Sequence, residues 1–294
     1  VMFSAWRLKQ VGLSPLKPRW DTAAAKTLLL TALPFALAGI FVKIYSSVDT
    51  ILLEQHVGEA TVGLYSIAYK LTYAFQFLPM AFVAALYPSF SKLIKERNTE
   101  ELSKVFYQSM WYMALISVPI VFGLFSVADI VVPMIYGEAY QGSIVALQVL
   151  IFALLFIFLD FPLGSILNAD DRQVTKTAIM GGTMVINVAA NAVLIPAIGL
   201  LGAPIAALLG FAWLLGAGLV ATKKTLAFSY ARLTKELFPI FLSGALMLGV
   251  VWFTKAYLGI VVIALGAIVY LTGLVILRVV SWKQLTDLLH GIRS

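Results

Sequence analysis

The stretch TLLLTALPFALAGIFVKIYSSVDTILL, residues 27–53, is almost wholly apolar and is long enough to cross a lipid bilayer as a helix. Two charged residues, Lys43 and Asp49, lie inside it. A charge at the centre of a bilayer costs about 2.5–3.5 kcal/mol on insertion scales, so membrane proteins keep one mainly where a pathway or a partner needs it. The stretch therefore predicts a membrane-spanning helix that contributes to a functional site.

The rest of the chain has the same apolar character. Of its 294 residues, 61% are hydrophobic and 12% are charged, whereas soluble domains have about 45–50% apolar and about 25% charged residues. Continuous apolar runs favour helices over the short alternating segments of a membrane β-barrel. We expect an all-α integral membrane protein with eight transmembrane helices, over residues 27–53, 63–89, 105–126, 143–167, 177–196, 202–222, 237–257 and 259–280. The short apolar segment from Ala128 to Tyr136, broken by Pro133, is predicted to be an interfacial turn.

Lysine and arginine gather in alternate connections between these spans. Eighteen of the 21 lie before residue 27, in 90–104, in 168–176, in 223–236 or from residue 278 onward. The positive-inside rule places this side in the cytoplasm. We expect a multi-pass protein of the cell (cytoplasmic) membrane with both termini cytoplasmic, and no nucleic-acid partner despite the net charge of +7. Two basic segments, Ser91–Val105 and Lys223–Pro239, have the mixed pattern of helices that lie at the headgroups.

The residue types needed for hydrolytic or metal chemistry are scarce. Cysteine is absent, and the only histidines are His56, in a predicted loop, and His290, in the tail. Neither a histidine-based zinc site nor a Ser-His-Asp triad can be assembled in the usual way. We therefore expect a protein that is not an enzyme and that has no cofactor and no metal site.

Polar residues in the first two spans recur at helical spacing. Lys43 lies on a stripe of small and hydroxyl residues that would suit the wall of a cavity, and Tyr45 lies four residues before Asp49, so that the phenol can reach the carboxylate. The second span has a comparable face, made of Tyr65, Ser66, Tyr69, Lys70, Tyr73 and Gln76.

Lys70 has two interpretations. It lies deeper in the membrane than Asp49 by roughly 6 Å at 1.5 Å per residue, a gap that a lysine side chain spans. An Asp49–Lys70 ion pair would fix two antiparallel helices without touching a ligand. Lys43 has no comparably placed acidic partner, which makes it the better candidate for meeting an anionic ligand.

Later spans carry fewer polar residues. Asp160, shortly before Pro162, is a candidate for carrying a coupling proton or sodium ion, although hydration near the interface or bonding within the bundle explains it slightly better. Asn187 and Asn191 are also candidates for ion coupling, and hydrogen bonds between helices are their simpler explanation.

The order of these residues resembles a known family, the polysaccharide (O-antigen-type) flippases of the multidrug, oligosaccharidyl-lipid and polysaccharide exporter superfamily. The resemblance is strongest over residues 33–93. It rests on Pro34-Phe35-Ala36-Leu37, Tyr45, Val48-Asp49-Thr50, Leu53, Val62-Gly63-Leu64-Tyr65-Ser66, Ala68-Tyr69-Lys70-Leu71, Pro79, Leu86-Tyr87-Pro88 and Ser91-Lys92-Leu93, and later on Ile135-Tyr136-Gly137 and Asn187 to Pro196.

The resemblance implies one six-helix lobe of an exporter fold, over 27–222, preceded by a basic linker over 1–26. A cytoplasmic amphipathic segment over 223–236, two additional C-terminal helices over 237–280 and a tail over 281–294 would follow. An N-terminal lobe is expected upstream in the same polypeptide or in a partner, because a lone lobe would expose its cavity to lipid.

The resemblance also implies a function, the flipping of polyprenyl-pyrophosphate-linked oligosaccharide by alternating access. Lys43 and Lys70 would then counter the pyrophosphate, and Tyr45, Tyr69, Tyr73 and Gln76 would complete the substrate cavity. The lipid bilayer and glycan polymerase machinery are further expected partners.

Two other functions remain open from the sequence. A cation-coupled multidrug antiporter of the same superfamily would typically use acidic residues, whereas these spans pair two lysines with two aspartates. A membrane-embedded glycan polymerase or ligase would usually have a large outer loop with catalytic arginine and histidine. No predicted outer connection is long enough for that, and Lys255 is the only lysine or arginine among them.

Overall fold

A computed structural model describes residues 21–279, and these residues are helical apart from their turns and one short linker. The elements, in chain order, are α2 (Thr22–Tyr45), α3 (Val48–His56), α4 (Glu59–Tyr73), η1 (Ala74–Gln76), α5 (Phe77–Lys95), α6 (Thr99–Tyr136), η2 (Glu138–Tyr140), α7 (Ser143–Leu150), α8 (Ala153–Ala169), α9 (Gln173–Ile198), η3 (Gly199–Leu201), α10 (Gly202–Thr222), α11 (Tyr230–Leu258), η4 (Gly259–Val261) and α12 (Val262–Ile276). Most of the predicted linker over 1–26, the whole tail over 281–294 and His290 lie outside the described residues.

Six helical stretches within residues 21–279 are long and apolar enough to cross a membrane. They are Thr22–His56, Glu59–Lys95, Thr99–Tyr136, Ser143–Ala169, Gln173–Thr222 and Tyr230–Ile276. The last two have 50 and 47 residues and contain the short 3-10 turns η3 and η4. The all-α, multi-pass membrane architecture is therefore confirmed, whereas the count of eight spans stays a prediction.

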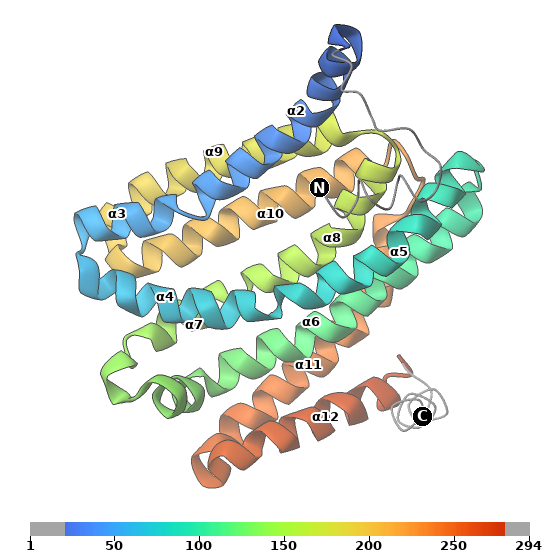
Figure 1. The fold of residues 1–294 in the computed structure, drawn as a ribbon. Coiled ribbons are helices and arrows are strands. Elements are labelled where there is room, and N and C mark those ends of the chain that lie inside the picture. Colours follow the sequence, from blue (N-terminus) through green and yellow to red (C-terminus); the bar gives the residue numbers. More distant parts are fainter. Residues whose placement is uncertain (1–20, 280–294) are drawn as a thin grey trace, which may run out of the picture.

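Helices α9 and α10 pack side by side on either side of η3, and α2 lies along α9 (Figure 1). The close approach depends on Gly202, where an added Cβ would lie 2.6 Å from the backbone nitrogen of Ile195. Further along the pair, a Cβ at Gly210 would lie 3.3 Å from the Cβ of Asn187. Small residues at such points let two helix backbones approach closely.

Helices α6, α7 and α8 hold the most deeply buried part of the core. The side chains of Met113, Val121, Leu147, Leu154 and Phe158 are wholly buried there. Helices α11 and α12 pack against each other and against α6, on the side away from α2, α9 and α10 (Figure 1).

The segment from Ala128 to Tyr136 is not a separate interfacial turn, as predicted, but the last part of α6. A proline near a helix end removes a single backbone hydrogen bond, so Pro133 does not break the helix before its final turn. The lysine of α11, Lys255, also holds this part of α6, because its Nζ donates to Asp129 Oδ2 at 2.7 Å and to the Ser126 carbonyl at 3.1 Å. The helix ends at Gly137, whose φ of 90° suits glycine.

The two segments predicted to lie at the headgroups are not independent helices. Ser91–Val105 is divided between the end of α5 and the start of α6, and Lys223–Pro239 is divided between a linker and the first turns of α11. The reason is local, since Asn98 and Ser229 each cap the N-terminus of a long helix with a side-chain oxygen.

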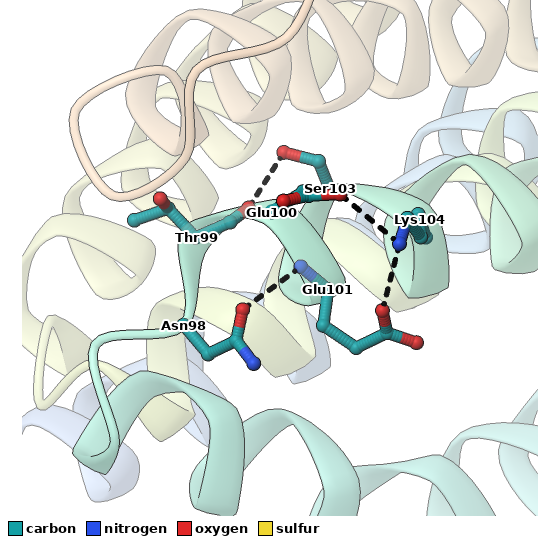
Figure 2. A network of polar contacts seen from close by, with 6 residues as sticks. All are labelled: Asn98, Thr99, Glu100, Glu101, Ser103 and Lys104. Carbon is teal, nitrogen blue, oxygen red and sulfur yellow. Dashed lines mark hydrogen bonds and ion pairs between the residues drawn. The ribbon is translucent and has the colours of Figure 1, made fainter.

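The cap at Asn98 gives a first testable prediction. Its Oδ1 accepts a hydrogen bond from the backbone N–H of Glu101 at 3.1 Å, next to the Lys104 pairs with Glu100 and Glu101 (Figure 2). Asn98→Ala should lower the free energy of unfolding by about 1 kcal/mol, because a helix N–H loses its acceptor. Asn98→Asp keeps an acceptor and should match the wild type. Unfolding in mixed SDS micelles measures both, and equal loss in the two variants would contradict the capping role.

Candidate functional site

A polar cavity of about 530 Å³ lies between α2, η1, α5, α8, α9 and α10. Its polar lining residues are Tyr45, Gln76, Tyr87, Asp160, Ser165, Asn168 and Lys176. Its apolar lining residues are Val42, Met80, Val83, Ala84, Ile157, Phe161, Gly164, Met180, Phe211 and Leu214. The cavity thus combines aromatic faces, amides and two opposite charges inside an apolar bundle.

Glycines make room for the two charged side chains of this cavity. A Cβ at Gly164 on α8 would lie 3.0 Å from both Cε and Nζ of Lys176, which therefore crosses close over the α8 backbone. A Cβ at Gly218 on α10 would lie 3.1 Å from Asp160 Oδ1. Neither glycine has a positive φ, so neither is required by its backbone conformation. What each contributes is the space left by its missing side chain.

A second, smaller pocket of about 80 Å³ shares Val42, Tyr45, Gln76 and Phe211 with the large cavity. Its other lining residues are Ser46, Asp49, Tyr69, Tyr73, Asn187 and Ala207. The rings of Tyr69 and Tyr73 are 4.2 Å apart between centroids, as expected for residues one helical turn apart. The polar faces predicted on the first two spans therefore meet here, whereas their role in binding substrate stays a prediction.

Asp49 is buried, and its partner differs from those predicted. The hydroxyl of Tyr65 donates to Asp49 Oδ2 at 2.5 Å, and the backbone N–H of Thr50 donates to Oδ1 at 2.7 Å. The expected hydrogen bond from Tyr45 does not form, although both residues line the small pocket, because α2 ends at Tyr45 and Asp49 belongs to the next helix, α3. No ion pair within 4.0 Å joins Asp49 to Lys70 in the described chain either.

Lys43 and Lys70 are both exposed in the structure, and neither lines the two pockets just described. Lys43 lies on α2, whose membrane-spanning window has no buried residue. Their predicted contact with an anionic ligand therefore stays a prediction that needs a second wall opposite α2.

The two asparagines of α9 bond to each other within their own helix. The Nδ2 of Asn191 donates to the carbonyl and to Oδ1 of Asn187, each at 3.0 Å, so the expected bonds between helices do not form. Asn191 Oδ1 is buried and has no partner among the described residues. Asn187 also lines the small pocket. Across residues 21–279, no three His, Asp or Glu side chains gather in a way that would hold a metal ion.

Sequence reasoning missed Lys176, the cation of the cavity, and also the polar lining residues Tyr87, Ser165 and Asn168. Its place at the edge of an apolar run predicts that Lys176 belongs to a loop over 168–176, yet α9 begins at Gln173 and carries it into the bundle. One signal was present in the sequence. Gly164 lies one turn after Asp160 on the same helix, and a small residue in a membrane helix allows a neighbouring helix to approach closely on the side that it occupies.

Comparisons with known proteins show which proteins this chain is similar to. A family model described as "Polysaccharide biosynthesis protein" matches residues 2–145. The chain is similar to the lipopolysaccharide biosynthesis protein WzxC of Escherichia coli, 29% identical over 43% of this chain and 26% of that protein. It is also similar to Agl15 of Haloferax volcanii, described as a probable low-salt glycan biosynthesis flippase, 22% identical over 72% of this chain and 44% of that protein.

A solved structure shows the same fold. The inward closed conformation of the lipid II flippase MurJ superposes with a TM-score of 0.69 at 16% identity, over 88% of this chain and 56% of that one. This chain spans less than half the length of the two curated relatives just named. The sequence comparisons confirm the resemblance to polysaccharide flippases, and the solved structure adds a shared fold.

Proposed function

We propose that this chain is part of a transporter that flips polyprenyl-pyrophosphate-linked oligosaccharide across the cytoplasmic membrane by alternating access, in polysaccharide biosynthesis. The observation that carries the proposal is the cavity of about 530 Å³, which places polar and charged groups inside an apolar helical bundle. Intramembrane polar residues of this kind mark substrate pathways. The similarity to proteins named for lipopolysaccharide and glycan biosynthesis supplies the class of substrate.

The lining of the cavity suits the parts of such a substrate. The rings of Tyr45 and Tyr87 offer faces for sugar rings, while Gln76 and Asn168 offer hydrogen bonds to hydroxyl groups. The cationic Lys176 suits a phosphate group. Moving the substrate between leaflets breaks no covalent bond, so the chain acts as a transporter and not as an enzyme.

The arrangement in the membrane follows from charge. We propose eight crossings, made by dividing Gln173–Thr222 at η3 and Tyr230–Ile276 at η4, with both termini in the cytoplasm. Lys92, Lys95 and Arg97 would then lie on the same side as Lys223 and Lys224. The first six crossings form a lobe, and α11 with α12 form the additional pair.

A second lobe would form the opposite wall of the cavity, because this chain covers 56% of the related solved flippase. Such a lobe, in the same polypeptide or in a partner, would also cover the exposed face of α2 and bring Lys43 and Lys70 next to the substrate. Asp49, Asn187 and Asn191 stay candidates for binding a coupling ion, and glycan polymerase machinery stays a candidate partner.

A cation-coupled multidrug antiporter is the second candidate function. The observation that favours it is the position of the acidic residues, since Asp49 and Asp160 line the two pockets whereas Lys43 and Lys70 do not. Lys176 argues against it, because a cation in the cavity repels cationic drugs.

Reconstitution tests the proposed function. The chain, with any sequence that flanks it in its gene, should flip a fluorescent polyprenyl-pyrophosphate oligosaccharide in proteoliposomes. Gln76→Leu should slow flipping about tenfold, because a net hydrogen bond of about 1–1.5 kcal/mol is lost from the cavity. Gln55→Leu, the same change at an exposed position outside the cavity, should leave the rate unchanged. Drug efflux without flipping would instead establish the antiporter.

A further inference from the structure

The cavity contains one cation and one carboxylate, and their arrangement indicates how the substrate is held and released. Resting on the proposed function, we propose that Lys176 binds the phosphate groups of the substrate and that Asp160 is the counter-charge that competes with them for Lys176. Substrate entry then replaces the attraction of Asp160 for Lys176 by a direct contact between Lys176 and phosphate, and substrate exit reverses this change.

The first support is the shape of the site. Gly164 places the Lys176 ammonium against α8, with 3.0 Å between Nζ and the position of an added Cβ, and Gly218 places Asp160 Oδ1 against α10 in the same way, at 3.1 Å. The two charges thus enter one cavity from different helices, α9 and α8. A methyl group at Gly164 would displace the Lys176 ammonium, and one at Gly218 would displace the Asp160 carboxylate. The position of each charged group therefore depends on a glycine in the facing helix.

The second support is that the two charges share the cavity without a direct contact. In the part of the chain that the structure describes, no ion pair within 4.0 Å joins Asp160 to Lys176. An ammonium group has three donors, so Lys176 keeps capacity for a new acceptor. Opposite charges in one low-dielectric cavity still offset each other, and a phosphate that reaches Lys176 must compete with that attraction.

The third support is that the neighbouring cation is already engaged. Arg172, one turn before Lys176, donates from Nη1 to the Ala221 carbonyl at 2.7 Å and to the Thr225 hydroxyl at 3.1 Å. The Thr225 hydroxyl in turn donates to Asp170 at 2.5 Å. Arg172 therefore joins the α8–α9 turn to the end of α10, while Lys176 points to the cavity. An acceptor of the cavity, Asn168 Oδ1, has no partner among the described residues and can take a hydroxyl group of the bound ligand.

Binding of geranylgeranyl pyrophosphate to the protein in nanodiscs tests the proposal, with the chain expressed together with any flanking sequence of its gene. Lys176→Gln should raise Kd tenfold or more, and Lys176→Arg should restore most of the affinity, because both cations bind phosphate. Lys224→Gln removes the same charge from an exposed position at the same end of the bundle and should leave Kd unchanged.

Asp160→Asn should change Kd in the direction opposite to Lys176→Gln. This difference separates competition for Lys176 from a purely structural role of Asp160. Removing the competing carboxylate should lower Kd severalfold and also slow flipping, because nothing then draws Lys176 away from the phosphate. Gly164→Ala should weaken binding severalfold by displacing Lys176. Gly216→Ala, where an added Cβ meets nothing within 4 Å, should not change it.

Each other outcome has a definite meaning. If the wild type binds geranylgeranyl pyrophosphate and Lys176→Gln binds it equally well, the Lys176 assignment is wrong while the proposed function stands. Weaker binding by Asp160→Asn would overturn the competition. If the wild type does not bind this probe, or binds only in proportion to added phosphatidylglycerol, the substrate class itself is wrong.

Discussion

Gly202→Ala should destabilise the protein by about 3 kcal/mol, at the upper end of the usual range for overpacking, and lower its unfolding temperature by roughly 10 °C. An added Cβ would lie 2.6 Å from the backbone nitrogen of Ile195 and 2.7 Å from the carbonyl oxygen of Leu194. These are backbone atoms of α9, which cannot rotate away as a side chain can. The change must therefore separate α9 from α10 or unwind η3.

The matched control for this prediction lies fourteen residues later on the same helix, about four turns away. Gly216→Ala meets nothing within 4 Å, so it should be neutral or stabilise α10 by up to about 1 kcal/mol through helix propensity. Thermal unfolding in detergent compares the two variants directly. Equal unfolding temperatures for Gly202→Ala and the wild type would mean that α9 and α10 do not approach each other as closely as described.

The architecture was largely predictable because the membrane imposes it. A helix in lipid must satisfy every backbone hydrogen bond internally, so apolar runs such as residues 27–53 identify the spans by length alone. The boundaries were less predictable, since a helix can continue past the apolar run. Lys176 and Pro133 both lie beyond the predicted ends of their spans, yet both are inside helices.

Part of the candidate site followed from helical spacing. Tyr69 and Tyr73 share a face because they are four residues apart on α4, and the structure brings them to the same pocket as Tyr45. What spacing does not reveal is where a helix is interrupted. The break at Ser46 and Ser47 places Tyr45 and Asp49 on two different helices, and the serines do not predict it, because serine occurs in helices and in turns.

The same helix interruption made the partner of Asp49 unpredictable. That partner is Tyr65, and its replacement gives the second large effect that we predict. Tyr65 is 1% exposed and Asp49 is 4% exposed, and their hydrogen bond has a length of 2.5 Å. Tyr65→Phe should lower the free energy of unfolding by about 2–3 kcal/mol, because a buried carboxylate loses its side-chain hydrogen-bond donor from α4. Tyr69→Phe, half-buried and with no hydroxyl bond among the described residues, should cost less than about 0.5 kcal/mol.

A double-mutant cycle with Asp49→Asn isolates the pair. An amide in place of the carboxylate has less need of the phenol, so Tyr65→Phe should cost only about 1 kcal/mol in the Asp49→Asn background. The difference predicts a coupling energy of about 1–2 kcal/mol, measured by unfolding all four proteins in mixed SDS micelles. Additive losses would show that Tyr65 stabilises the fold through packing alone.

The same variants separate the two roles proposed for Asp49. If the carboxylate only fixes α3 against α4 through Tyr65, Asp49→Asn should flip substrate in proteoliposomes as fast as the wild type does. This should hold both with and without a sodium or proton gradient. If it binds a coupling ion, the variant should lose the dependence of flipping on that gradient while keeping its stability, since the amide still accepts from Tyr65 but carries no charge for the ion. Tyr65→Phe leaves the charge in place, so it should keep the gradient dependence even as it lowers stability.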